Sequence, residues 1–105
     1  MSDPHGPSRD AAVAAVTGAG RAAPQVFGDH RDLLGSGLVD AVVIASPNMT
    51  HVDVLGDVLD TDVHVMVEKP LCTTVADCRR VVDAAAGGPA AVSYTHLTLP
   101  TILRV

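Results

Sequence analysis

The chain has 105 residues, 48% of them hydrophobic, and a formal net charge of -5. This length suits one small domain and is short for a two-domain enzyme, while the acidic balance argues against a nucleic-acid-binding surface. No stretch resembles a signal peptide or is long enough to span a membrane, so we expect a cytoplasmic protein without a membrane partner.

The N-terminal third contains two predicted helices and one short strand. The first helix is expected between Ser8, whose hydroxyl suits an N-cap, and Gly18, which favours a helix end. The segment "PQVF" at residues 24–27 fits a short edge strand. A second, short helix is predicted after Asp29, again a suitable N-cap, and should end at Gly35.

The segment "VDAVVIASP" predicts the first central strand. Its residues are apolar and mostly β-branched between Asp40 and Pro47, which is typical of a strand buried on both faces. The next segment, "NMTHVDVLGDVLD", has apolar residues at helical spacing and aspartates mostly on the other side. The predicted buried stripe of this helix consists of His51, Leu55, Val58 and Leu59.

A second strand and a further helix follow. "VHVMVE" predicts the strand, and "TTVADCRRVVDAAAGG" predicts a helix with Thr74 as N-cap, Asp77 as its capping-box partner and Gly87 as the stop. The predicted buried stripe of this helix consists of Val75, Cys78, Val82 and Ala85.

Alternating strands and helices with short connections predict an α/β fold with a parallel sheet. Ligands bind at the carboxyl ends of the strands in such sheets. The side chains expected at that edge are Ser46, Asn48, Glu68 and Lys69. Lys69 is the only lysine of the chain. It could be a functional residue, or it could simply be the first solvated residue after a buried strand. Its position alone leaves both interpretations open.

The two cysteines, Cys72 and Cys78, lie close together in the sequence and have no histidine or further cysteine at metal-ligand spacing. They predict neither a disulfide framework nor a zinc site. We expect them to be small apolar residues of a reduced protein, and we expect no metal.

The segments "DAVVIASPNMTH" and "VHVMVEKPL" together resemble paired motifs of the Gfo/Idh/MocA family of NAD(P)-dependent oxidoreductases, named for glucose-fructose oxidoreductase and inositol dehydrogenase. Ser46 stands where the family more often has threonine, which keeps the hydroxyl. Upstream, "SDP" and "FGDHRDLL" also resemble the family pattern. The resemblance runs from about Ser2 to Gly87 and rests on the spacing of both motifs.

The resemblance implies a Rossmann-type fold that binds NAD or NADP, with Lys69 as the catalytic residue beside the hydride-transfer carbon. Asp3 would bind the adenosine ribose and Glu68 the nicotinamide ribose, and the bond before Pro70 would be cis. The implied cofactor-binding residues are Asp3, Ser46, Pro47, Asn48, His51, Glu68, Lys69 and Pro70. A lysine can change its protonation in a desolvated site where arginine cannot, which suits proton handling during alcohol oxidation.

Two histidines have plainer interpretations. His51 fits a cofactor-side residue but also a helix-start residue whose ring is hydrogen-bonded locally. His64 alternates into a strand and is expected to be structural.

Residues 1–91 are expected to be a truncated Rossmann domain that lacks the first strand and the Gly-x-Gly-x-x-Gly turn, which holds the pyrophosphate in this family. Residues 92–105 differ in composition, and "VSYTHLTLPT" resembles the translation of a sequencing-library adaptor. We therefore expect these 14 residues to be a non-native tail, although "AVSYTHLTL" also alternates like a strand.

The leading hypothesis is a fragment, inactive alone, of a dehydrogenase that oxidises a sugar, cyclitol or related polyol and forms a homo-oligomer when complete. The main alternative is a non-catalytic half-Rossmann module that binds a nucleotide or a partner. A receiver-like signalling domain is disfavoured, because its phospho-acceptor should close a central strand, whereas Asp40 opens one and Ser46 closes it.

Overall fold

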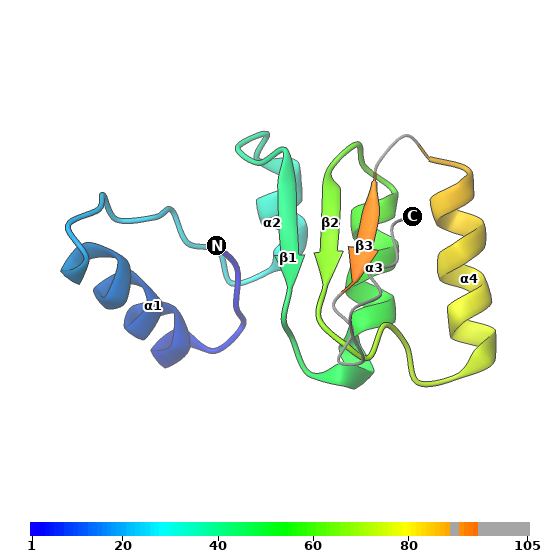
Figure 1. Ribbon diagram of the computed structural model, residues 1–105. Coiled ribbons are helices and arrows are strands. Elements are labelled where there is room, and N and C mark those ends of the chain that lie inside the picture. Colours follow the sequence, from blue (N-terminus) through cyan, green and yellow to red (C-terminus); the bar gives the residue numbers. More distant parts are fainter. Residues whose placement is uncertain (89–90, 95–105) are drawn as a thin grey trace. The chain divides into compact units, whose positions relative to one another are not determined.

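The computed structural model describes residues 1–88 and 91–94. The chain divides into two compact units, residues 1–38 and residues 39 onward. Figure 1 shows helices α1 and α2 in the first unit, and a sheet with helices α3 and α4 in the second. The described part of the chain contains no helix with both the length and the apolar character that a bilayer span requires.

Helix α1 (Gly6–Gly18) ends at the predicted residue but begins before the predicted one. His5 is its N-cap, and Ser8 lies within the helix, with its Oγ 2.8 Å from His5 Nδ1. The start moves toward the N-terminus because Pro7 fits the first helical turn, where no backbone N–H is needed. The prediction of Ser8 as N-cap was therefore wrong.

The predicted edge strand at residues 24–27 is reduced to one parallel bridge between Ser2 and Phe27. The Asp3 N–H donates to the Phe27 carbonyl at 3.1 Å, and the Phe27 N–H donates to the Met1 carbonyl at 2.9 Å.

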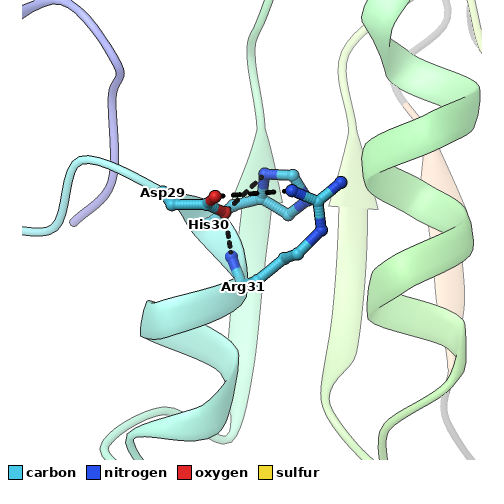
Figure 2. Close-up of polar contacts among 3 residues, drawn as sticks. All are labelled: Asp29, His30 and Arg31. Atoms are coloured by element: carbon cyan, nitrogen blue, oxygen red, sulfur yellow. Dashed lines mark hydrogen bonds and ion pairs between the residues drawn. The ribbon is translucent and has the colours of Figure 1, made fainter.

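Helix α2 (His30–Gly35) begins after Asp29 and ends at Gly35, as predicted. Asp29 Oδ1 accepts a hydrogen bond of 2.8 Å from the Arg31 N–H, and its Oδ2 lies 3.4 Å from Arg31 Nη1 (Figure 2). His30 Nδ1 lies 3.7 Å from Asp29 Oδ1. The Arg31 N–H bond, followed by the charges of Arg31 and His30, holds the pKa of the Asp29 carboxyl below its ordinary value, against partial desolvation.

The second unit contains a parallel sheet in the order β1-β2-β3, formed by β1 (Ala41–Ile44), β2 (His64–Val67) and β3 (Val92–Tyr94). Ile44 pairs with Val67, so β1 and β2 end at the same level (Figure 1). The predicted α/β class with a parallel sheet is confirmed.

The core lies on one face of this sheet. Ile44, Val65 and Val67 point toward that face and are nearly fully buried, and helix α3 packs against β1 and β2. On the other face, Val43 is 64% and Met66 44% exposed. The prediction that the first strand is buried on both faces was therefore wrong for β1. Its apolar run does not distinguish the packed face from the open one, because both carry small β-branched side chains.

Helix α3 (His51–Leu59) follows a short 3-10 turn, η1 (Asn48–Thr50), directly after the first strand-end loop. Its buried residues are His51, Leu55 and Val58, which stand at helical spacing and confirm the predicted stripe. Leu59, the fourth predicted member, is half-buried.

Helix α4 (Val75–Ala86) packs against α3, but its buried stripe differs from the prediction. Val81 is 5% exposed, whereas Val75 is 73% and Val82 57% exposed. Cys78 is half-buried, as predicted. The two adjacent valines, Val81 and Val82, give two stripes of equally good helical spacing through Cys78, and contact with α3 selects the one through Val81.

Cys72 and Cys78 form a disulfide, so the prediction of two reduced thiols was wrong. The chain turns into α4 between them, and the first turn of the helix brings Cys78 back toward Cys72 with a Cα–Cα distance of 5.7 Å. This distance is in the usual range for disulfides. Sequence spacing could not show it, because it depends on how the segment enters the helix.

Strand β3 lies within residues 92–105, the segment predicted as a tail. It pairs in parallel with β2, in agreement with the strand-like alternation of "AVSYTHLTL". The rest of that segment, residues 95–105, lies outside the described residues, and its non-native origin stays a prediction.

Candidate functional site

The candidate site lies at the edge of the sheet where β1 and β2 end. Ile44 pairs with Val67, and the Glu68 N–H donates to the Ile44 carbonyl at 2.9 Å. The segments 46–48 and 68–70 therefore leave the sheet side by side, as predicted from the parallel order.

A serine and a threonine hydroxyl hold the first loop. Thr50 Oγ1 lies 2.7 Å from Ser46 Oγ and 2.7 Å from the Pro47 carbonyl oxygen, and the Thr50 N–H donates to the same carbonyl at 2.8 Å. Ser46 is half-buried, whereas Asn48 is exposed. Sequence reasoning missed Thr50, although a threonine four residues after a serine at a helix start is a recognisable signal.

His51 connects the two loops. Its side chain is 1% exposed, with Nε2 2.8 Å from the Ser46 carbonyl oxygen and Nδ1 2.7 Å from the Pro70 carbonyl oxygen. A neutral imidazole carries one N–H and can donate to one of these carbonyls, whereas an imidazolium can donate to both. His51 is thus a helix-start residue whose ring is hydrogen-bonded. One of its two partners, Pro70, belongs to the second loop and not to the segment before the helix.

Glu68 and Lys69 are exposed at the carboxyl edge, directly after β2. The peptide bond between Lys69 and Pro70 is cis, as the resemblance implied. Because the Pro70 carbonyl is bonded to the His51 ring, the backbone that carries Lys69 is attached to the start of α3.

Asp3 belongs to the first unit, where it lies just before α1. Its Oδ1 accepts a hydrogen bond of 2.7 Å from the His5 N–H, and its carbonyl accepts one from the Arg9 guanidinium. These contacts fix the backbone that leads into the helix.

His64 is exposed and has a structural contact, as predicted. Its Nδ1 accepts a hydrogen bond of 2.8 Å from the Ala91 N–H, next to the start of β3. It therefore helps join β2 to the segment that follows α4.

The exposed groups at the sheet edge are an amide, a carboxylate and an ammonium, from Asn48, Glu68 and Lys69. A carboxylate and an amide suit the hydroxyls of a ribose, and an ammonium suits an alcohol or carbonyl oxygen. These residues therefore fit a nicotinamide nucleotide. No group of three or more potential metal ligands occurs among residues 1–88 and 91–94.

Comparison with known proteins gives a family match over most of the chain. Residues 4–96 match the model of GFO_IDH_MocA, described as "Oxidoreductase family, NAD-binding Rossmann fold". The inositol 2-dehydrogenase of Salmonella typhimurium is 40% identical over 58 residues, which are 55% of this chain and 17% of that protein. A glycosyl hydrolase family 109 protein of Shewanella putrefaciens is 36% identical over 89 residues, or 81% of this chain and 19% of that protein.

Among solved structures, the WlbA dehydrogenase from Bordetella pertussis, in complex with NADH and UDP-GlcNAcA, is similar with a TM-score of 0.78 and 29% identity. The similarity covers 89% of this chain and 26% of that one. The chain thus spans less than a fifth of the two sequence relatives and about a quarter of this structural one. By the family match, it belongs to the Gfo/Idh/MocA oxidoreductases, which have the NAD-binding Rossmann fold.

Proposed function

We propose that this chain is the nicotinamide-side part of a longer NAD(P)-dependent dehydrogenase that oxidises a CH–OH group of a sugar, cyclitol or related polyol. The observation that carries the proposal is the position of the only lysine, between Glu68 and Pro70, at the edge where two parallel strands end. The names of the Salmonella inositol 2-dehydrogenase and of the WlbA complex with UDP-GlcNAcA support this substrate class.

In this proposal the strand-end residues hold the cofactor. Asn48 and Glu68 are exposed at the edge and would bind the nicotinamide riboside, with Ser46, Pro47, His51 and Pro70 shaping the loops beneath it. Asp3 would bind the adenosine ribose, as the family resemblance implies. The family is described as NAD-binding, and NADP stays an alternative for this protein.

Lys69 is the proposed catalytic residue. The bound nicotinamide supplies the hydride acceptor. As the substrate alcohol becomes a carbonyl, its carbon loses a hydride and its oxygen loses a proton. The neutral Lys69 amine would accept that proton, and the ammonium so formed would donate a hydrogen bond to the carbonyl oxygen. The His51–Pro70 bond would keep the Lys69 backbone in position for both.

The isolated chain is proposed to be inactive. It spans 17% of the Salmonella relative, and the groups that select a substrate are expected elsewhere in the longer protein. We expect that protein to be cytoplasmic and homo-oligomeric.

A second candidate is cleavage of a glycosidic bond at the same cofactor site. It is favoured by the Shewanella relative, which is named a glycosyl hydrolase family 109 protein and aligns over 81% of this chain. Assays with a polyol and with an aryl glycoside separate the two. The dehydrogenase accumulates reduced cofactor from the polyol, whereas the glycosidase releases the phenol without net cofactor reduction.

The proposal is tested by Lys69→Met in the full-length enzyme that carries this segment. We expect kcat to fall by about 10²–10⁴-fold, the usual contribution of a general acid or base, with cofactor affinity close to wild type. Lys69→Arg keeps the charge but not the proton exchange and should be nearly as slow. Arg79→Met, an exposed cation on α4, is the matched control and should turn over normally. A normal turnover rate for Lys69→Met would contradict the catalytic role, and Lys69 would then be only a solvated residue at the end of the strand.

A further inference from the structure

The disulfide between Cys72 and Cys78 joins the segment that follows Lys69 to the first turn of α4. Both cysteines are half-buried. A small thiol or disulfide molecule can therefore approach them without unfolding of the chain.

The segment from Lys69 to Cys72 is attached on two sides. On one side the Pro70 carbonyl is bonded to the buried His51 ring, at 2.7 Å. On the other side Cys72 is bonded to Cys78 in α4. Only Pro70 and Leu71 separate Lys69 from Cys72, so breaking the sulfur bond releases an attachment close to the lysine.

The start of α4 does not depend on the sulfur bond. Thr74 Oγ1 accepts a hydrogen bond of 3.1 Å from the Asp77 N–H, and the Cys78 N–H donates to the Thr74 carbonyl at 3.1 Å. With the helix start held in this way, a reduced Cys78 keeps its place in the first turn of α4, six positions along the chain from Cys72. The two sulfurs are then ready to bond again after reduction.

The short separation of the two cysteines also favours a reversible bond over a purely stabilising one. They are six positions apart, and a short ring restricts the unfolded chain less than a long one. The chain has no third cysteine that could compete as a partner.

We propose that Cys72 and Cys78 form a reversible thiol–disulfide pair that controls how firmly the Lys69–Cys72 segment is attached to α4. In the oxidising direction one thiolate attacks a small disulfide such as oxidised glutathione and releases one glutathione thiolate. The second cysteine thiolate then attacks the mixed disulfide and releases the other glutathione. Two electrons pass from the cysteines to glutathione, and the protons of both cysteine thiols pass to solvent. An effect on turnover rests on the proposed function of Lys69, but the exchange itself does not.

The equilibrium is tested on the chain in glutathione buffers of graded composition, with alkylation and mass spectrometry to count thiols. We expect the folded chain to be oxidised with an equilibrium constant at least about tenfold larger than the same chain in urea, because the fold holds the cysteines at bonding distance. Cys72→Ser and Cys78→Ser should each stop at a mixed disulfide with glutathione. Equal constants in the folded and unfolded chain would overturn the proposal, as would loss of the fold on reduction.

The attachment is tested by the NMR signals of the histidine rings in the oxidised and reduced chain. We expect the His51 signals to shift on reduction, because its partner Pro70 lies two residues from Cys72. His64, which is bonded to Ala91, is the control and should not shift. If the His51 signals did not change on reduction, the disulfide would have no effect on the Lys69–Cys72 segment, and the proposal would be overturned. Both measurements need neither cofactor nor substrate, so they can fail or succeed independently of the Lys69 experiment.

Discussion

His51 illustrates what one buried side chain does for the candidate site. Its ring reaches the Ser46 carbonyl five residues away and the Pro70 carbonyl 19 residues away. The first contact could be anticipated from a histidine at a helix start. The second could not, because it requires β1 and β2 to be neighbours and the chain to turn back at Pro70.

We predict that His51→Phe lowers the free energy of unfolding by about 1–3 kcal/mol, because it keeps a ring of similar size but removes the ring nitrogens that contact the Ser46 and Pro70 carbonyls. The matched control is His64→Phe, which removes one exposed hydrogen bond to Ala91 and should cost less. Urea unfolding of both variants is the measurement. Equal losses would mean that the bonds of His51 contribute no more than a surface contact.

The second prediction at this scale concerns Asp29 and the pH dependence of its contribution to stability. Because its folded pKa is depressed, its contribution to stability is present above the unfolded pKa and is lost as the pH falls through the folded value. We expect helix α2 to lose its capping contribution in the acid range below about pH 4.

The Arg31 amide proton reports this loss directly, because it donates to Asp29 Oδ1. In the wild-type chain its NMR signal should move with pH in the acid range. Asp29→Ser keeps a capping oxygen but has no carboxyl, so the same signal should no longer follow pH there. An identical pH response in both chains would exclude Asp29 as the origin.

At the scale of elements, helices were predicted more reliably than the faces they bury. The Thr74 N-cap and the end of α4 at Ala86, before Gly87, follow from local chemistry and were confirmed. The buried side of α4 was assigned to Val82 instead of Val81, because local spacing permits both and only contact with α3 selects one. Likewise, the apolar run of β1 gave no sign that Val43 is 64% exposed.

The N-cap of α4 provides a prediction for this scale. Thr74→Ala removes the hydroxyl oxygen that accepts from the Asp77 N–H and should lower the free energy of unfolding by about 1 kcal/mol. Thr73→Ala, the exposed neighbour outside the helix, is the control and should have little effect. Urea titration followed by circular dichroism measures both, and a larger loss for Thr73→Ala would contradict the cap.

At the scale of the whole molecule, the fold class could be predicted from the alternation of strands and helices, and the family from the pairing of two short motifs. The parallel order predicted from that alternation places the strand-end motifs "ASPN" and "EKP" at one edge, and the pairing of Ile44 with Val67 agrees with it. The division after Leu38 was not predicted, although a short Gly-Ser-Gly segment, residues 35–37, lies directly before it. The disulfide was not predicted either, because the short distance between Cys72 and Cys78 depends on how the chain enters α4.

We predict that the isolated chain shows no saturable binding of NAD(H) or NADP(H) at micromolar concentration. The pyrophosphate of a dinucleotide is usually held by a Gly-x-Gly-x-x-Gly turn at a helix N-terminus, and that motif does not occur in this sequence. Titration calorimetry is the measurement, with a full-length inositol 2-dehydrogenase as the positive control. Clear binding would contradict the fragment hypothesis and favour a nucleotide-binding module.

The exposed position of the only lysine also makes the site chemically addressable. An amine-directed reagent meets one side chain, Lys69, and the N-terminal amine of Met1, which donates to the Gln25 carbonyl at 2.8 Å. Reductive methylation with a ¹³C-labelled aldehyde therefore installs one spectroscopic probe at the candidate site and one at the terminus, without any change of sequence. The first of these two signals would report ligands, redox state and pH at the sheet edge, and the second would serve as its internal reference.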